Sequence, residues 1–190
     1  MDAISLFSGC GGDSEGMRQA GFNVVLHIEK DTNGIASLNA NFDNESVMRA
    51  DITKIDKKEV FGKYKGNVNL IFAGFPCQGF SHAGKKDPSD NRNRLFYDFK
   101  DITNIVKPAF IFGENVKGIM TRKDPDGIPV VNRIINEFAE IGYVMKAQLY
   151  CMIDPLFFIT LTVHMSNIEE EVKAEEYAAA SIKVLKGLEA

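Results

Sequence analysis

The chain has 190 residues, of which 45% are hydrophobic and 25% are charged, a composition typical of soluble globular domains rather than of disordered chains. The chain has a net charge of −4 and therefore lacks the excess of basic residues found in most nucleic-acid-binding domains. No apolar stretch approaches the roughly 20 residues of a membrane helix, and the first residues show no secretory signal. We therefore expect no membrane association and a cytoplasmic location, or a nuclear one in a eukaryote.

The charge and the cysteines are unevenly distributed along the chain. Residues 151–190 hold seven of the 26 acidic side chains and three of the 22 basic ones, so residues 1–150 hold 19 of each. Cys10, Cys77 and Cys151 form no Cys-x-x-Cys pair, and the histidines have no ligand spacing. Neither a disulfide framework nor a metal site is supported. A cysteine with a special role is therefore expected to be reactive rather than structural.

Apolar runs alternate with helical periodicities along the first 150 residues. The runs predict strands at 3–7, 24–29, 48–52, 70–73, 109–113 and 143–150. Helices are expected near 13–20, where Asp13 or Ser14 could form the N-cap, and near 31–41, 95–106 and 130–141, with 54–67 forming a helix or a surface loop. This order predicts an α/β fold with a doubly wound, mostly parallel sheet and helices on both faces.

The first predicted strand leads directly into Ser8-Gly9-Cys10-Gly11-Gly12. A strand, a glycine turn and a helix N-terminus are the parts of a nucleotide-type cofactor site, although a plain tight turn would look the same. Glu29 follows Gly9 by 20 residues, the spacing of a ribose-binding carboxylate; the alternative is a solvated acid. Asp51 is placed either to meet the base of the cofactor or to cap a turn.

Two candidate reactive groups follow neighbouring strands. Gly74 and Pro76 end the apolar run at 70–73, so Cys77 stands at the carboxyl edge of the sheet, where ligands bind in such folds. Cys77 is either an exposed nucleophile or a small half-buried side chain. Glu114 follows the next strand and is expected at the same edge. The composition of the polar segment 82–94 predicts a lid over this edge. The alternative is that its basic residues are simply exposed to solvent.

These segments together resemble the ordered motifs of the cytosine-5 DNA methyltransferases. The resemblance covers residues 3 to about 150 and implies the Rossmann-like methyltransferase fold. It is carried by five segments in order: residues 7–12 (Phe-Ser-Gly-Cys-Gly-Gly), Glu29, Asp51, residues 74–78 (Gly-Phe-Pro-Cys-Gln) and residues 114–116 (Glu-Asn-Val).

The resemblance implies transfer of a methyl group to carbon 5 of a cytosine in DNA. Cys77 would add to carbon 6 of the ring and make carbon 5 nucleophilic. A protonated Glu114 would relieve the negative charge at ring nitrogen 3. Asn115 would position Glu114 or the base.

The resemblance also implies S-adenosylmethionine as the methyl donor. Phe7, Gly9 and Gly11 would line its pocket, and Glu29 would hold the ribose. Asp51 and Ile52 would hold the adenine, while Gly74 and Pro76 would border the methionine portion. The target cytosine must be flipped out of the duplex. The residues expected to fill the gap and close over the base are Gln78, Ser81 and Arg92.

The chain departs from the family pattern at two places. Ser5 stands where the family usually has an acid, and the expected Gln-Arg-x-Arg segment after residue 150 is missing, since no arginine follows Arg133. We therefore expect residues 1–150 to form the cofactor-binding catalytic domain. Residues 151–190 would be a divergent strand and an acidic helix in place of the target-recognition part.

Three hypotheses follow from this pattern. The first is a methyltransferase that uses a complementing chain for target recognition. The second is a truncated, non-catalytic binding protein that keeps the methyltransferase fold. The third is a relative that acts on transfer RNA, although Phe75 before Pro76-Cys77 favours DNA.

Overall fold

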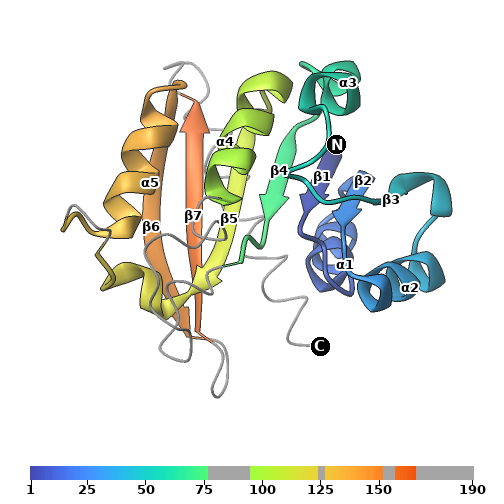
Figure 1. The fold of residues 1–190 in the computed structure, drawn as a ribbon, viewed down its shortest axis with the longest axis horizontal. Coiled ribbons are helices and arrows are strands. Elements are labelled where there is room, and N and C mark those ends of the chain that lie inside the picture. Colours follow the sequence, from blue (N-terminus) through green and yellow to red (C-terminus); the bar gives the residue numbers. More distant parts are fainter. Residues whose placement is uncertain (77–94, 124–126, 152–156, 166–190) are drawn as a thin grey trace.

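The computed structural model describes residues 1–76, 95–123, 127–151 and 157–165. Within these residues seven strands form one sheet in the order β3-β2-β1-β4-β5-β7-β6 (Figure 1). The first five strands pair in parallel, whereas β7 is antiparallel to both β5 and β6. The strands are β1 (Asp2–Leu6), β2 (Asn23–Glu29), β3 (Val47–Arg49), β4 (Leu70–Ala73), β5 (Phe110–Val116), β6 (Tyr143–Cys151) and β7 (Phe157–Met165).

The helices cover both faces of the sheet, as alternate residues of the central strands show. Ile71 and Ala73 of β4 pack in one apolar cluster with α4 and α5 side chains. Leu70 and Phe72 pack in a second cluster with Met17 of α1. The α-helices are α1 (Gly12–Gln19), α2 (Thr32–Asn41), α3 (Lys57–Phe61), α4 (Leu95–Val106) and α5 (Val130–Ala139). The described 3₁₀ turns are η1 (Asn44–Ser46), η2 (Gly62–Tyr64) and η5 (Lys117–Met120). The doubly wound fold predicted from the sequence is confirmed.

Local sequence explains where these helices begin and end. The side chain of Asp31 accepts hydrogen bonds from the second and third amides of α2, and Asp56 does the same for α3, as good N-caps do. On α4 the buried residues recur at helical spacing: Leu95, Phe96, Phe99, Ile102, Thr103 and Val106. Lys107 then takes a positive φ of 54°, and Pro108 prevents the helix from continuing.

Three predicted boundaries are wrong in an informative way. The third strand ends at Arg49, because Asp51 turns its side chain onto the backbone of Thr53. The fifth strand extends to Val116, because β7 pairs with it over that whole length. Glu114 and Asn115 therefore lie within β5 rather than after it. The first helix is preceded by Gly11 without a side-chain cap, so neither Asp13 nor Ser14 has the capping role that we expected of one of them.

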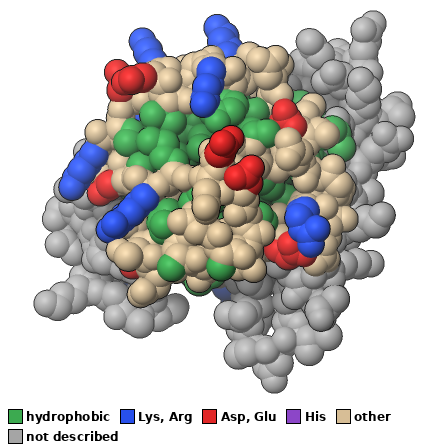
Figure 2. All heavy atoms as spheres, turned by 90° about the vertical axis from the view of Figure 1, so that its right-hand side faces the viewer, with side chains coloured by type: hydrophobic (Ala, Val, Ile, Leu, Met, Phe, Trp, Pro, Cys, Tyr) green, Lys and Arg blue, Asp and Glu red, His purple; other side chains and the backbone are tan. Residues whose placement is uncertain are grey.

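Strand β7 comes from the segment after residue 150, yet it lies between β5 and β6 in the same sheet. At the opposite edge, β3 has three residues. Figure 2 shows hydrophobic side chains gathered on this side of the molecule, and the open groove beside β3 includes Leu26, Met48, Ile55, Val60 and Tyr64. Among the described residues, no helix is long and apolar enough to cross a membrane.

Candidate active site

The turn between β1 and α1 is built from backbone in the left-handed region. Phe7, Gly9 and Gly11 have φ angles of 59°, 53° and 91°. Glycine adopts this region readily, whereas the strain at Phe7 costs on the order of 1–3 kcal/mol, and such strain concentrates at ligand sites. Hydrogen bonds from Ser8 N to Ile28 O and from Gly11 N to Ser8 O hold the turn. The turn is therefore a fixed and partly strained feature of the fold.

The side chain of Glu29, at the end of β2, is held by three backbone amides. Its Oε2 accepts from Gly9 N at 2.8 Å, and its Oε1 accepts from Lys30 N at 2.7 Å and from Asp31 N at 2.8 Å. Glu29 thus links the glycine turn to the start of α2. Oε1 thus uses both of its lone pairs, whereas Oε2 keeps one with which to accept a hydrogen bond from a ligand hydroxyl.

Helix α2 packs closely on this turn. A Cβ at Gly34 would lie 2.7 Å from Gly9 O and 2.9 Å from Glu29 Cγ, and a Cβ at Gly11 would lie 2.6 Å from Phe42. Both positions must therefore stay without a side chain. Our sequence analysis missed Gly34. The sequence feature that could have revealed Gly34 is its position inside a predicted helix. A glycine weakens a helix there, so its presence usually reflects close packing against another element.

A cavity of about 130 Å³ lies at the carboxyl ends of β1, β2 and β4. It is lined by Phe7, Ile28, Glu29, Lys30, Ala50, Asp51, Ile52, Gly74, Pro76 and Leu95. Six of the eight predicted cofactor residues thus surround one cavity, and Gly9 and Gly11 shape the turn beside it. Apolar walls with a few carboxylates suit a nucleoside, whose base is flat and apolar and whose hydroxyl groups donate hydrogen bonds.

Asp51 caps a turn, which is one of the two alternatives that the sequence left open, and it also lines this cavity. Its Oδ1 accepts hydrogen bonds from Thr53 Oγ1 at 2.7 Å and from Thr53 N at 3.1 Å. These bonds, together with the positive charges of Lys30 and Lys54, hold the pKa of Asp51 below its ordinary value. Asp51 is therefore a constant hydrogen-bond acceptor at neutral pH.

Glu114 reaches the carboxyl end of β4 from β5. A Cβ at Gly74 would lie 3.3 Å from Glu114 Oε2, so the carboxyl group occupies the space that the glycine leaves. Burial, and after it the negative charge of Asp13, raises the pKa of Glu114 from 4.5 to about 6. A carboxyl group with such a pKa can hold or donate a proton near neutral pH.

The neighbouring Asn115 is buried and fixes the chain before Cys77. Its Nδ2 donates to Phe75 O at 2.9 Å, and its Oδ1 accepts from Val116 N at 2.9 Å. Both ends of the amide are therefore used. The residues predicted on the substrate side, Cys77, Gln78, Ser81 and Arg92, lie outside the described residues.

Asp13 is a second carboxyl group at this edge, and the sequence analysis considered it only as a helix cap. The Ser5 hydroxyl lies within hydrogen-bond distance of Asp13 Oδ2, and Ser14 Oγ lies 3.3 Å from Oδ1. Burial nevertheless raises the pKa of Asp13 to about 6 against these hydrogen bonds. The family pattern has an acid at the position of Ser5, so here a carboxyl group reaches that position from α1.

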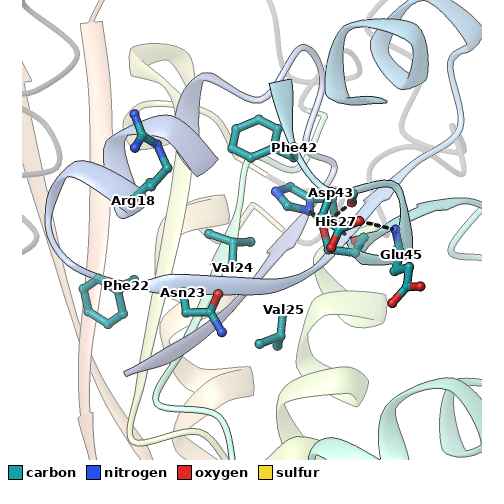
Figure 3. Close-up of a pocket in the computed structure, with 10 residues that line it drawn as sticks. Arg18, Phe22, Asn23, Val24, Val25, His27, Phe42, Asp43 and Glu45 are labelled. Atoms are coloured by element: carbon teal, nitrogen blue, oxygen red, sulfur yellow. Dashed lines mark hydrogen bonds between the residues drawn. The ribbon is translucent and has the colours of Figure 1, made fainter. Parts of the chain in front are cut away.

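A larger cavity of about 410 Å³ contains none of the predicted site residues (Figure 3). It lies beside the first half of β2, where His27 packs on Phe42 with ring centroids 4.7 Å apart. His27 Nδ1 lies 3.2 Å from Ser46 O, and burial lowers the pKa of this histidine. Since ligands of such folds bind at the carboxyl ends of the strands, the smaller cavity is the candidate ligand site.

The sheet order, the glycine turn and the acids at the strand ends define a Rossmann-like domain of the methyltransferase class. Comparison of sequences identifies the family: the sequence model of the C-5 cytosine-specific DNA methylases matches residues 1–154. The chain therefore belongs to the C-5 cytosine-specific DNA methylase family.

Curated relatives are bacterial Type II methyltransferases. The chain is 41% identical over 143 residues to M.DdeI of Desulfomicrobium norvegicum, covering 75% of this chain and 34% of the relative. It is 37% identical over 149 residues to M.PspPI of a Psychrobacter species, covering 77% of this chain and 34% of that relative. The chain thus spans about a third of the length of these relatives.

Solved structures agree with this fold. The structure described as a DNA modification methyltransferase encoded within an E. coli prophage has a TM-score of 0.72 and 26% identity, with 89% of this chain and 48% of that chain covered. Spodoptera frugiperda DNMT2 has a TM-score of 0.68 at 24% identity, covering 88% of this chain and 50% of that one.

Proposed function

We propose that this chain is the catalytic part of an enzyme that transfers a methyl group from S-adenosylmethionine to carbon 5 of cytosine in DNA. The observation that carries the proposal is the placement of Glu114. Its half-buried carboxyl group, with a pKa raised to about 6, lies against Gly74, which lines the nucleoside-type cavity, in a chain of the cytosine-5 methylase family. Cytosine chemistry needs such a protonated acid beside the methyl donor.

The residues around the cavity fit the cofactor. S-adenosylmethionine, when bound, supplies an electrophilic methyl group. Glu29 would accept hydrogen bonds from its ribose hydroxyls, and Asp51 with Ile52 would hold its adenine. The remaining walls, formed by Phe7, Gly74 and Pro76, would border the sugar and the methionine portion, beside the turn shaped by Gly9 and Gly11.

Three residues would act on the cytosine. The Cys77 thiolate would add to carbon 6, and a proton held by Glu114 at ring nitrogen 3 would take up the negative charge that this addition creates. Asn115 would keep the backbone at Phe75 in place, so that the approach of Cys77 is set by β5. Carbon 5 would then take the methyl group of the donor, whose sulfur–methyl bond breaks. Loss of the carbon 5 proton and elimination of the cysteine would release the methylated base.

DNA would be bound through residues beyond this cavity. Gln78, Ser81 and Arg92 would fill the space left by the flipped base and close over it. Because the first 150 residues carry no net charge, sequence reading would come from a complementing chain or domain with a basic surface. The reaction would take place where cellular DNA lies, which in a bacterium is the cytoplasm.

Covalent trapping tests the proposal. The chain is incubated with S-adenosylmethionine and a duplex that contains 5-fluorocytosine, first alone and then with candidate complementing chains. Fluorine cannot leave carbon 5 as a proton does, so the enzyme remains bound to the base. We expect a protein–DNA adduct whose mass maps to Cys77.

The matched controls are Cys77→Ala and Cys10→Ala. Cys10 is an exposed cysteine of the glycine turn and has no role in the addition, so its replacement should leave the adduct intact, whereas Cys77→Ala should abolish it. Methyl transfer by the Cys77→Ala variant would refute the covalent mechanism. Absence of S-adenosylmethionine binding to the wild-type chain would refute the assignment of the cavity.

A further inference from the structure

Two carboxyl groups from distant parts of the sequence lie at the carboxyl edge of the sheet. Asp13 comes from the first turn of α1 and Glu114 from β5. Ser5 and Glu114 lie on the same face of the sheet, because Ala3 of β1 and Phe112 of β5, each two residues before them, share the apolar cluster of α1 and strand side chains alternate between faces. The negative charge of Asp13 acts on Glu114 at this place.

The surroundings of Asp13 support either protonation state. The Ser5 hydroxyl lies close to Asp13 Oδ2 and 2.7 Å from Ser8 Oγ, and Ser8 Oγ lies 3.1 Å from Ser5 O. When Asp13 is ionised, the Ser5 hydroxyl can donate to it. When Asp13 is protonated, the same hydroxyl can accept from it and donate to Ser8 instead. The network therefore holds the carboxyl group in place in both states, and donation from Ser5 lowers the pKa of Asp13 and so favours its ionised form.

The other described neighbours of Glu114 do not offset this charge. Gly74 and the carbonyl oxygen of Phe7 border the same space, and neither carries a positive charge. Glu29, Lys30 and Asp51 line the adjoining cavity, but among the described residues only Asp13 contributes a charge effect to the pKa of Glu114. Two like-charged carboxyl groups at one site cannot both ionise readily, so they titrate as a pair.

We propose that Asp13 is a positioning residue that acts through Glu114: its ionised carboxylate, held by Ser5, keeps the remaining proton of the pair on Glu114, where the cytosine ring needs it. The role in catalysis rests on the proposed function, whereas the coupling between the two carboxyl groups is a property of the protein alone. The proposal requires no further reactant, because one proton is shared by Asp13 and Glu114 until negative charge develops on the cytosine ring.

The coupling is tested without substrate by a titration. Protein labelled with ¹³C at the side-chain carboxyl carbons is followed by NMR from pH 4 to pH 8, and the Glu114 signal is assigned by its loss in Glu114→Gln. In the wild-type chain we expect the Glu114 midpoint near 6. In Asp13→Asn the midpoint should fall by the part of the shift that the Asp13 charge causes, while burial keeps it above 4.5. Each unit of the decrease makes deprotonation of Glu114 about tenfold easier.

Asp101→Asn is the matched control. Asp101 is an exposed residue of α4 that pairs with Lys57, and the substitution removes the same charge without touching the site, so the Glu114 midpoint should not move. Should Asp13→Asn fold poorly, Asp13→Ser removes the charge and keeps a small polar group beside Ser5. A Glu114 midpoint that is the same with and without the Asp13 charge would overturn the proposal.

A second readout addresses catalysis. If the proposed methyl transfer occurs, Asp13→Asn should move the alkaline limb of the pH–rate profile to lower pH by up to about one unit and leave the rate nearly unchanged at pH values well below the lowered midpoint. A merely structural role would lower the rate by the same factor at every pH, and that result would refute the positioning role. A wild-type chain without methyl transfer contradicts the proposed function instead, and the NMR titration still decides the coupling.

Discussion

Asn115 donates its side-chain amide to the carbonyl oxygen of Phe75 across 2.9 Å and thereby ties β5 to the backbone just before Cys77. The bond is buried and joins residues that are 40 positions apart in the sequence. Because the same amide also accepts from Val116 N, its orientation cannot change without leaving a buried group unpaired. One side chain therefore connects the strand of Glu114 to the segment that carries the proposed nucleophile.

Replacing Asn115 should destabilise the fold. Asn115→Ala leaves Phe75 O without its partner, which costs about 1–3 kcal/mol in the free energy of unfolding. The measurement is urea unfolding, with Asn104→Ala as the control because Asn104 is exposed on α4 and its side chain accepts an exposed hydrogen bond from Lys107. The control should stay within about 0.5 kcal/mol of the wild type. Equal effects of both substitutions would contradict the structural importance of the buried bond.

Replacing Glu29 should weaken binding of the cofactor. In Glu29→Gln one carboxylate oxygen becomes an NH₂ group, which must face a backbone N–H from Gly9 or from residues 30 and 31. Hydrogen bonds to a charged group contribute about 1.5–3 kcal/mol, so we expect the Kd for S-adenosylmethionine to rise about 10–100-fold by calorimetry. Glu59→Gln on α3 is the control. An unchanged Kd in Glu29→Gln would remove Glu29 from the binding site.

Gly34 should tolerate no side chain. In Gly34→Ala the new Cβ would lie 2.7 Å from Gly9 O, so α2 or the glycine turn must shift, at a cost of about 1–3 kcal/mol. The control is Gly62→Ala, since Gly62 has a φ of −59° and no heavy atom within 4 Å of its Cβ position. We expect lower stability and weaker cofactor binding only for Gly34→Ala. Similar unfolding curves for the two variants would show that α2 adapts freely.

The sequence predicted the parts of the fold that depend on local pattern. Strand β4 and helix α4 have the predicted bounds, because an apolar run before Gly74 and a helical period ended by Pro108 are local features. The length of β5 could not be predicted in this way. It is set by pairing with β7, whose residues lie more than 40 positions further along the chain.

The candidate site shows the same division. Glu29 and Asp51 were predicted because they follow strands at recognisable spacing, and both line the cavity. Gly34 and Asp13 were missed because their importance comes from close approach between elements. Gly34 must lack a side chain because α2 packs against the glycine turn at this residue. The charge of Asp13 matters because the side chain of Glu114, which comes from β5, lies close enough to respond to it. Spacing along one segment carries no information about such contacts.

Stability should depend on pH through the same two carboxyl groups. The pKa values of Asp13 and Glu114 are raised from 3.8 and 4.5 to about 6 in the folded chain. The folded state therefore binds these protons more tightly than the unfolded state, so their contribution to stability is fully present below about pH 4 and is lost as the pH rises through about 6. We expect this source to lower the free energy of unfolding by about 1–3 kcal/mol between pH 4.5 and pH 7.

Urea unfolding of the wild type and of Asp13→Asn/Glu114→Gln over pH 4.5–7 isolates this effect. Glu15 does not contribute to the difference, because its pKa is lowered to about 2 and its contribution is lost only at pH values below the range. Removing both titrating groups should flatten the curve, so the wild type should lose stability relative to the double variant as the pH rises. Two parallel curves would mean that the folded-state pKa values of Asp13 and Glu114 are not raised, and the proposed protonation of Glu114 would lose its physical basis.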